Sequence, residues 1–300
     1  MRVLVPEPQM STVPTTSGLR TRPVTRFEPP SLRSLRPLRE LARLTQFTDL
    51  LKTLSIHRVK VRYQRSQLGM LWALLHPLSM MLVFALMVSF LRGAPAQEVP
   101  YAVFAYAGLL PWTAFSSGLS SASGALTSHA ALVTKVAFPR EILPVTYVVA
   151  ALADLAIAST ALVGMMFWFH VRLTPTAIWS VVAVALLALF LVAAGLIVSA
   201  VQVRHRDVGL AMPVVLQMWM FATPVLYPLS AARRALSPAL YGLYIANPMA
   251  GIVDSFRRAV VLNQHPDSAT LAVSALVILA LLPASYVYFK HAERTMADVV

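Results

Sequence analysis

Asp154 is a candidate for a functional ionisable group, because it interrupts an otherwise uncharged run from Ile142 to Val171. It is the only acidic residue within the long uncharged runs of the chain. An ionisable side chain inside a membrane is costly and is a candidate for carrying protons or substrate. Asp154 could therefore serve a proton-coupled transporter. The alternative is a protonated or helix-paired acid with a purely structural role in a helix bundle.

The other motifs exclude most chemistry on covalent bonds. The chain has no cysteine, so disulfides, thiolate metal sites and cysteine nucleophiles are excluded. Neither H-x-x-x-H nor H-E-x-x-H occurs, and no nucleophile–base–acid set is evident. His76 and His170 lie near the ends of uncharged runs and are interpreted as structural. We expect no metal, no cofactor and no enzymatic activity in this chain.

The composition is that of a membrane protein. Of the 300 residues, 58% are hydrophobic and only 12% are charged, with a mean hydropathy of +0.69. Soluble domains carry about 25% charged residues. The net charge of +13 could indicate nucleic-acid binding, but the basic residues gather at the N-terminus and in short segments between uncharged runs. That distribution is typical of the positive-inside rule.

Six runs, uncharged except for Asp154 in the third, are long enough to cross a bilayer, which needs about 20 helical residues. They are Ser66–Leu91, Val99–Thr134 (one span with a polar tail of small residues), Ile142–Val171, Leu173–Val203, Val208–Ala232 and Ala269–Phe289. We therefore expect an all-α integral membrane protein with six transmembrane helices in residues 66–300. Because 13 of the 25 Lys and Arg residues precede Ser66, both termini are predicted to be cytoplasmic.

Two segments come before the first run. Residues 1–36 are rich in Pro, Ser, Thr and Arg without apolar periodicity, which predicts a disordered tail. Over 37–65, apolar residues recur every three or four positions up to Leu54, which predicts an amphipathic helix over 38–56 and then a basic linker. This helix could lie in the headgroup layer or pack on a soluble domain. The basic residues that follow it favour a cytoplasmic membrane anchor.

The region between the fifth and sixth runs, residues 229–268, is too apolar for an ordinary exposed loop. Within it, the uncharged stretch Ala239–Val253 is too short to span the bilayer, which is typical of re-entrant or interfacial helices. Pro224 and Pro228 indicate in addition that the fifth helix is broken near its end.

Four short motifs follow one another at matching places in this six-span layout. They are Arg62 to Ala73 (RYQRSQLGMLWA) with His76-Pro77-Leu78, Phe138 to Pro144 (FPREILP), Arg206-Asp207 with Thr223 to Pro228 (TPVLYP), and Asn247 to Ala250 (NPMA) with Phe256-Arg257. In this order they resemble the permease subunits of type-2 ATP-binding-cassette exporters of bacterial surface polysaccharides and teichoic acids. The resemblance covers about residues 40–295.

This resemblance implies a homodimer of permeases in the bacterial inner membrane, with a channel at the dimer interface. Two copies of a separate ATPase subunit, which binds ATP and Mg, would drive it; the chain itself has no G-x-x-x-x-G-K-S/T phosphate loop. The 38–56 helix would contact that ATPase, and 229–262 would form re-entrant helices on the outer side.

The resemblance also places a coupling helix, which docks on the ATPase, at Ser123 to Lys135. The 123–141 loop is independently the longest internal cytoplasmic loop of the predicted topology, so it is the best candidate for transmitting force. The coupling residues expected are Ser123, His129, Lys135, Phe138, Pro139, Arg140 and Glu141. The alternative role for its charged residues is that of simple positive-inside anchors.

Aromatic and basic residues supply the candidates for contact with substrate. A sugar polymer could slide on aromatic faces in a channel, and Arg62 and Arg65 could meet the pyrophosphate of a lipid carrier. The full candidate set is Arg62, Arg65, Trp72, Tyr106, Trp112, Phe115, Tyr227, Tyr241 and Tyr244. The alternative for each aromatic residue is the ordinary aromatic belt at the membrane interface.

The function expected from the sequence is export of a lipid-linked polysaccharide, such as an O-antigen-like or capsule-like glycan, to the outer face of the membrane. One rival is a type-2 exporter of a small hydrophobic compound. The other is an independent secondary transporter that uses Asp154. Export without any ATPase partner would favour the secondary transporter.

Overall fold

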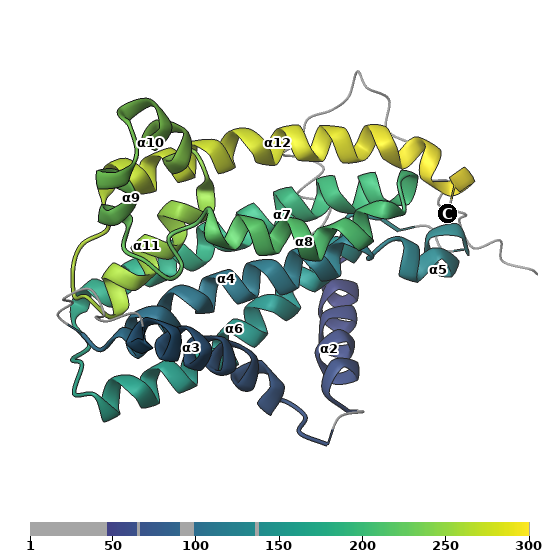
Figure 1. Ribbon diagram of the computed structural model, residues 1–300. Helices are drawn as coiled ribbons and strands as arrows, with labels where there is room; N and C mark the ends of the chain where they lie inside the picture. Colours follow the sequence, from purple (N-terminus) through teal and green to yellow (C-terminus); the bar gives the residue numbers. More distant parts are fainter. Residues whose placement is uncertain (1–46, 65–66, 91–98, 136–137, 300) are drawn as a thin grey trace, which may run out of the picture. The chain divides into compact units, whose positions relative to one another are not determined.

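The computed structural model describes residues 47–64, 67–90, 99–135 and 138–299, and every regular element in these ranges is helical (Figure 1). All of them belong to one unit, Leu35–Val300. The elements are α2 (Thr48–Gln64), α3 (Leu71–Phe90), α4 (Tyr101–Ser123), η3 (Thr127–His129), α5 (Ala130–Lys135), α6 (Ile142–Trp168), η4 (Pro175–Ile178), α7 (Trp179–Arg204), α8 (Asp207–Phe221), α9 (Leu229–Ala235), α10 (Pro238–Ile245), α11 (Pro248–Val260) and α12 (Ser268–Val299). Helices suit an apolar chain because they pair their backbone groups within one segment.

Helix α4 lies inside the bundle. It packs against α3, α6, α7, α8 and α11, and nearly all of its side chains from Val103 to Phe115 are buried. Glycine lets its neighbours approach: a Cβ at Gly118 would lie 2.9 Å from the Cβ of Ala151 on α6. Packing of helices in membranes depends on such small residues, because lipid tails give helices no hydrophobic reason to associate.

Four of the described helices are long and apolar enough to cross a bilayer by length and composition. They are α3, α6, η4 with α7 (Pro175–Arg204), and α12 up to Arg294. Helix α4 has 23 residues but includes several serines and glycines, which a helix covered by other helices can carry without facing lipid. Helix α8 has only 15 residues. The chain is therefore a multi-pass helical protein.

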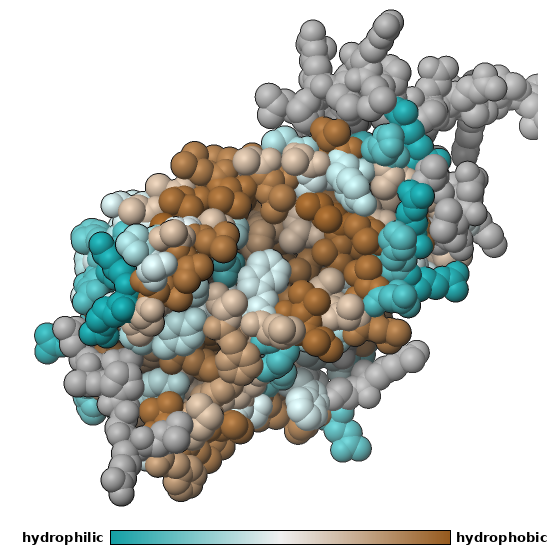
Figure 2. All heavy atoms as spheres, turned by 45° about the horizontal axis from the view of Figure 1, so that its top comes forward, coloured by the Kyte–Doolittle hydropathy of each residue, from teal (hydrophilic) through white to brown (hydrophobic). Residues whose placement is uncertain are grey.

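The surface supports this assignment. Figure 2 shows brown apolar side chains over the middle of one face, with teal hydrophilic side chains toward both ends. The long apolar helices expose large apolar residues: on α3, Val83 is 61% exposed and Phe90 is 82% exposed. Exposed apolar patches of this extent do not occur on monomeric soluble proteins without a purpose.

The predicted fifth run, Val208–Ala232, is not one helix. Helix α8 ends at Phe221, and the chain turns through Pro224 and Pro228 before α9 begins at Leu229. The predicted break at these prolines is confirmed, and the cause is that proline lacks the N–H a helix needs. Helices α9, α10 and α11 then gather at one end of the bundle (Figure 1).

Arg257 of α11 binds the backbone of this broken stretch. Its side chain is 1% exposed, and its guanidinium donates to the carbonyls of Tyr227 (3.1 Å), Val225 (3.0 Å) and Pro224. The guanidinium carbon also lies 3.9 Å from the centre of the Phe104 ring of α4. The arginine therefore supplies the donors that a continuous helix would otherwise have provided.

The N-terminal helix differs from its prediction in extent. The predicted tail and the start of the 38–56 helix lie outside the described residues. Helix α2 is described from Thr48 and continues to Gln64, so the predicted basic linker is helical up to that residue. Its Lys, Arg and Gln residues are good helix formers, and neither Gly nor Pro occurs between Thr48 and Gln64.

We predict that Gly108→Ala destabilises the protein by about 1–3 kcal/mol, the cost of overpacking a tight contact. A Cβ at this position would lie 2.3 Å from the carbonyl oxygen of Val225 and 2.6 Å from Arg257 Nη2. Gly164→Ala on α6 is the matched control, because nothing lies within 4 Å of its added Cβ. It should be neutral or stabilising by up to about 1 kcal/mol. Thermal melting of both purified variants measures the difference; equal melting temperatures would contradict the packing argument.

Candidate functional site

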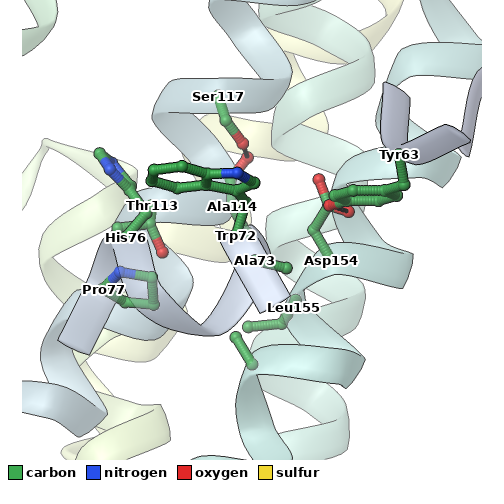
Figure 3. Close-up of a pocket in the computed structure, with 11 residues that line it drawn as sticks. Tyr63, Trp72, Ala73, His76, Pro77, Thr113, Ala114, Ser117, Asp154 and Leu155 are labelled. Carbon is green, nitrogen blue, oxygen red and sulfur yellow. Dashed lines mark hydrogen bonds between the residues drawn. The ribbon is translucent and has the colours of Figure 1, made fainter. Parts of the chain in front are cut away.

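A pocket of about 240 Å³ opens between four helices (Figure 3). Helix α3 contributes Trp72, Ala73, His76 and Pro77, and the other walls come from α2, α4 and α6. Those walls are formed by Tyr63, Thr113, Ala114, Ser117, Asp154, Leu155 and Ala158. The pocket thus gathers the candidate substrate residue Trp72 and the intramembrane acid Asp154, which lie 82 positions apart in the sequence.

Asp154 is bonded to the N-terminal helix. The hydroxyl of Tyr63, near the end of α2, donates to Asp154 Oδ1 at 2.5 Å. Tyr63 is 9% exposed, so this bond is largely shielded from solvent. The expected structural role of Asp154 as a helix-paired acid therefore agrees with this contact. The carboxyl group of Asp154 also lines the pocket.

Trp72 stands at the edge of this pocket. It is 53% exposed and lies in the first turn of α3. Figure 3 shows its indole ring with Tyr63 and Asp154 on one side of it. A flat, half-exposed ring beside a carboxylate and hydroxyl groups can bind a polar ring-shaped ligand.

The predicted coupling segment lies at the end of the bundle opposite to α9–α11 (Figure 1). Ser123 ends α4, where its Oγ donates to the carbonyl of Ser120 at 2.7 Å. Helices η3 and α5 follow, and Lys135 is the last residue of α5. Phe138 packs on a hydrophobic cluster that includes Leu143 and Tyr286. Pro139 leads into α6, its carbonyl accepting from the N–H of Ile142 at 3.1 Å.

His129 bonds this segment to α2. Its Nδ1 donates to the carbonyl of Ala125 at 2.8 Å, and its Nε2 accepts from the guanidinium of Arg58. Burial lowers the pKa of the His129 imidazole below its usual range, and the neighbouring Arg58 charge adds to this effect. The neutral ring is the form that can accept a hydrogen bond from arginine. The guanidinium of Arg58 also lies 4.3 Å from the centre of the Tyr147 ring of α6.

Arg140 and Glu141 bind the end of the same segment to α12. Lys290 Nζ lies 3.0 Å from Glu141 Oε2 and 3.0 Å from Glu293 Oε2. Arg140 Nη1 donates to the backbone carbonyl of Glu293 at 2.9 Å. Burial raises the pKa of the Glu141 carboxyl, an effect that the Lys290 charge opposes. These contacts bind the end of the coupling segment to the last helix. A coupling role for Arg140 and Glu141 stays a prediction.

Three candidate channel residues lie in the core. Tyr106 and Phe115 are 0% exposed and Trp112 is 3% exposed. The Tyr106 hydroxyl donates to the carbonyl of Ala158 on α6 at 2.9 Å. Phe115 stacks on Phe190 with ring centres 5.1 Å apart. These side chains stabilise helix packing, and a role in contacting substrate stays a prediction for them.

Tyr227, Tyr241 and Tyr244 lie together at the opposite end from the coupling segment. The hydroxyls of Tyr227 and Tyr244 are 3.1 Å apart, and the rings of Tyr241 and Tyr244 stack with their centres 6.4 Å apart.

Of the two candidate arginines, Arg62 lies on α2 and Arg65 lies outside the described residues. The structure therefore separates the described candidates into a group on α2 and α3, a buried group on α4, and a group between the end of α8 and α10.

Sequence reasoning missed several residues of these sites. Tyr63 was part of a motif, but nothing in its spacing showed that it would reach Asp154. His76 was interpreted as structural, and it lines the pocket. Lys290 and Glu293 are three residues apart near the end of the chain, which was a usable signal for a charged helix face. Their partner Glu141 is too distant in sequence for any local rule to find.

The fold and the exposed apolar faces define a helical, multi-pass membrane protein. Within the described ranges no three His, Asp or Glu side chains are placed to hold a metal ion. The family model described as ABC-2 type transporter matches residues 49–261. This chain therefore belongs to the ABC-2 type transporter family.

Its relatives match over most of its length. It is 32% identical over 263 residues to the "O-antigen export system permease protein RfbA" of Myxococcus xanthus, which covers 86% of this chain and 97% of that protein. It is 27% identical over 214 residues to the RfbA protein of Klebsiella pneumoniae, covering 70% and 79%. It is 23% identical over 252 residues to the "Polysialic acid transport protein KpsM" of Escherichia coli, covering 82% and 94%.

We predict that Lys290→Met destabilises the protein by about 3–5 kcal/mol, because it leaves the buried Glu141 carboxylate without its cation. The double variant Glu141→Gln/Lys290→Met should lose less than Lys290→Met alone. Lys60→Met on the exposed face of α2 is the matched control and should change the melting temperature little. Melting temperatures of the three purified variants measure this.

The stability of the Lys290→Met variant should depend on pH. Without Lys290, the folded-state pKa of Glu141 rises further above its unfolded value, so the folded state takes up the proton. The stability of Lys290→Met then falls as the pH rises above the ordinary glutamate pKa, and its deficit shrinks between about pH 8 and about pH 5. A deficit that is independent of pH would show that Glu141 is not the group left uncompensated.

Proposed function

We propose that this chain is the membrane-spanning subunit of an ATP-driven exporter that moves a lipid-linked surface polysaccharide from the cytoplasmic face to the outer face of the inner membrane. The observation that carries the proposal is the match to an O-antigen export permease over 97% of that protein's length. Relatives named for O-antigen export and for polysialic acid transport share polysaccharide as the cargo. A small hydrophobic compound has no such support.

The proposed topology has six spans, formed by α3, α4, α6, α7, α8 and α12. Helix α4 is added to the four apolar spans because its length suffices and its neighbours shield its polar residues. Helix α8 is added because, although short, it is apolar and continues into the chain break that Arg257 stabilises. In this topology α10 and α11 are re-entrant helices on the outer side, and both termini are cytoplasmic.

The coupling segment then faces the cytoplasm. We place the docking surface for a separate ATPase, which binds ATP and Mg, on η3 and α5. Contacts to α2 through His129 and to α12 through Glu141 and Arg140 support this assignment. A segment that transmits force must be bonded to the helices it moves, and this segment is bonded to two of them.

A second copy of the chain completes the proposed channel. Helix α3 has a single buried residue, Pro77, among its 20 residues, and α8 exposes Leu210 (82%) and Met218 (70%). These apolar faces have few neighbours within one copy. In a homodimer they could face each other or the lipid, and the α2–α3 pocket would open toward the cytoplasmic half of the shared path.

Removal of this chain from its host should abolish the surface polysaccharide and leave lipid-linked polymer inside the cell. The measurement is lectin or antibody labelling of intact cells, together with extraction of polymer from the inner membrane. Re-expression of the chain should restore the surface label. Normal surface polymer in the deletion strain would contradict the proposed function, and a surface polymer that survives loss of every ATPase partner would favour a secondary transporter.

Disruption of the docking surface should separate the two subunits. Ala131, on α5, is exposed, so Ala131→Glu should lower co-purification of the partner ATPase about tenfold without changing the melting temperature of this chain. The matched control is Gln264→Glu, at an exposed position in the loop before α12. Undiminished co-purification with Ala131→Glu would place the docking surface elsewhere.

A further inference from the structure

The pocket between α2, α3, α4 and α6 has the chemistry of a sugar-binding site, and we propose that it holds one sugar ring of the exported glycan. The inference rests on the proposed function and adds to it the place and the chemical class of a recognised group. That group is a single sugar ring with free hydroxyls and without a strong negative charge.

An aromatic face is the first requirement, and Trp72 meets it. One face of a sugar ring is formed by C–H groups, which pack on the flat surface of an indole ring. Trp72 is 53% exposed, so part of its ring remains accessible from the pocket opening. A tryptophan that only filled space between helices would be buried, as Trp112 is at 3%.

Hydrogen-bond acceptors and donors are the second requirement. Asp154 provides a carboxylate, which can accept several hydrogen bonds at once, so the bond from Tyr63 is compatible with bonds from sugar hydroxyls. The hydroxyls of Thr113 and Ser117 donate to carbonyls of their own helix at 3.1 Å and 3.4 Å. Their oxygen lone pairs can therefore accept, and the imidazole of His76 can do either.

A backbone carbonyl adds to this set. Pro77 lies inside α3 and lines the pocket together with Ala73, four residues before it. Proline has no N–H, so it cannot give the carbonyl of Ala73 the usual helical bond. A carbonyl in an apolar environment needs a donor. A sugar hydroxyl at this place would supply one.

The size and charge of the pocket select among polar ligands. Its volume of about 240 Å³ lies just below the range of pockets for drug-sized molecules, which begins near 300 Å³, so one ring fits better than an oligosaccharide. Among the lining residues that the structure describes, none is Lys or Arg, and one is an aspartate. These described residues offer no cation to the pyrophosphate of a lipid carrier, so they favour a neutral or amino sugar.

The test uses the full chain in lipid nanodiscs and a panel of methyl glycosides of common bacterial sugars, with inorganic pyrophosphate as the anionic probe. Saturation-transfer NMR reports binding of each probe. We expect saturable binding of at least one glycoside and none of pyrophosphate. Trp72→Ala should abolish glycoside binding, and Asp154→Asn should weaken it about tenfold, the loss of one good polar contact.

Trp168→Ala is the matched control, because Trp168 is 77% exposed at the far end of α6 and does not line the pocket. It should bind glycoside like the wild type. Trp72 is half-exposed, so its replacement should leave the melting temperature unchanged even if Asp154→Asn does not fold. Absence of glycoside binding to the wild type, or undiminished binding to Trp72→Ala, would overturn the proposal.

Surface export in cells separates this proposal from the proposed function. Suppose that surface polymer requires the chain, and that Trp72→Ala lowers the amount of surface polymer while Trp168→Ala does not. Both the sugar-site proposal and the proposed function are then supported. If the chain is needed but Trp72→Ala and Asp154→Asn export normally, only the sugar site fails. If surface polymer does not depend on the chain at all, the proposed function fails and the glycoside-binding result alone decides whether the pocket recognises sugar.

Discussion

The structure depends on one constraint, which is that backbone polar groups in an apolar environment must find partners within the protein. Regular helices satisfy it almost everywhere in the described chain. The constraint is hardest to meet between Phe221 and Leu229, where two prolines end the helix. There Arg257 turns inward and donates to the carbonyls of Pro224, Val225 and Tyr227. The buried Arg257 guanidinium is tolerated because its N–H groups replace the backbone N–H donors that a continuous helix would supply.

The buried Arg257 side chain constrains the neighbouring helices. Gly108 of α4 has no side chain because the Val225 carbonyl and the Arg257 guanidinium occupy the space beside it. Phe104 presents its ring to the same guanidinium. The packing of α4 and α11 is therefore set by the need to satisfy a broken backbone.

Helix α2 connects the two sites at the proposed cytoplasmic side. Arg58 bonds it to the coupling segment through His129, and Tyr63, little more than one turn later, bonds it to Asp154 in the pocket. A displacement of the coupling segment would therefore reach the pocket through a single helix. The two contacts thus link the coupling segment and the pocket through α2.

The sequence predicted the class of the fold well because uncharged runs of about 20 residues have few other uses. The runs containing α3, α6, α7 and α12 yield helices, and Pro224 and Pro228 marked the helix break. Local rules could not show that α4 would lie inside the bundle, so Tyr106 and Phe115 were expected at a channel. Nor could they pair Tyr63 with Asp154 or Glu141 with Lys290, because such contacts depend on helices that meet only in the folded chain.

The motif resemblance supplied what periodicity could not. It indicated the family from residues such as Trp72 and Pro139, and the family model that matches residues 49–261 confirms it. The structure adds the exposure of the aromatic candidates: Trp72 is half-exposed and Trp112 is buried. Contact with substrate stays a prediction for both.

Reconstitution of this chain with its partner ATPase in proteoliposomes is the most direct test of the proposed ATP-driven export. Lipid-linked glycan is placed in the leaflet that bears the ATPase, and an impermeant glycosidase on the other side reports its arrival. We expect cleavage to require both ATP and this chain. Cleavage without ATP, or no cleavage while the complex hydrolyses ATP in the presence of the glycan, would contradict it.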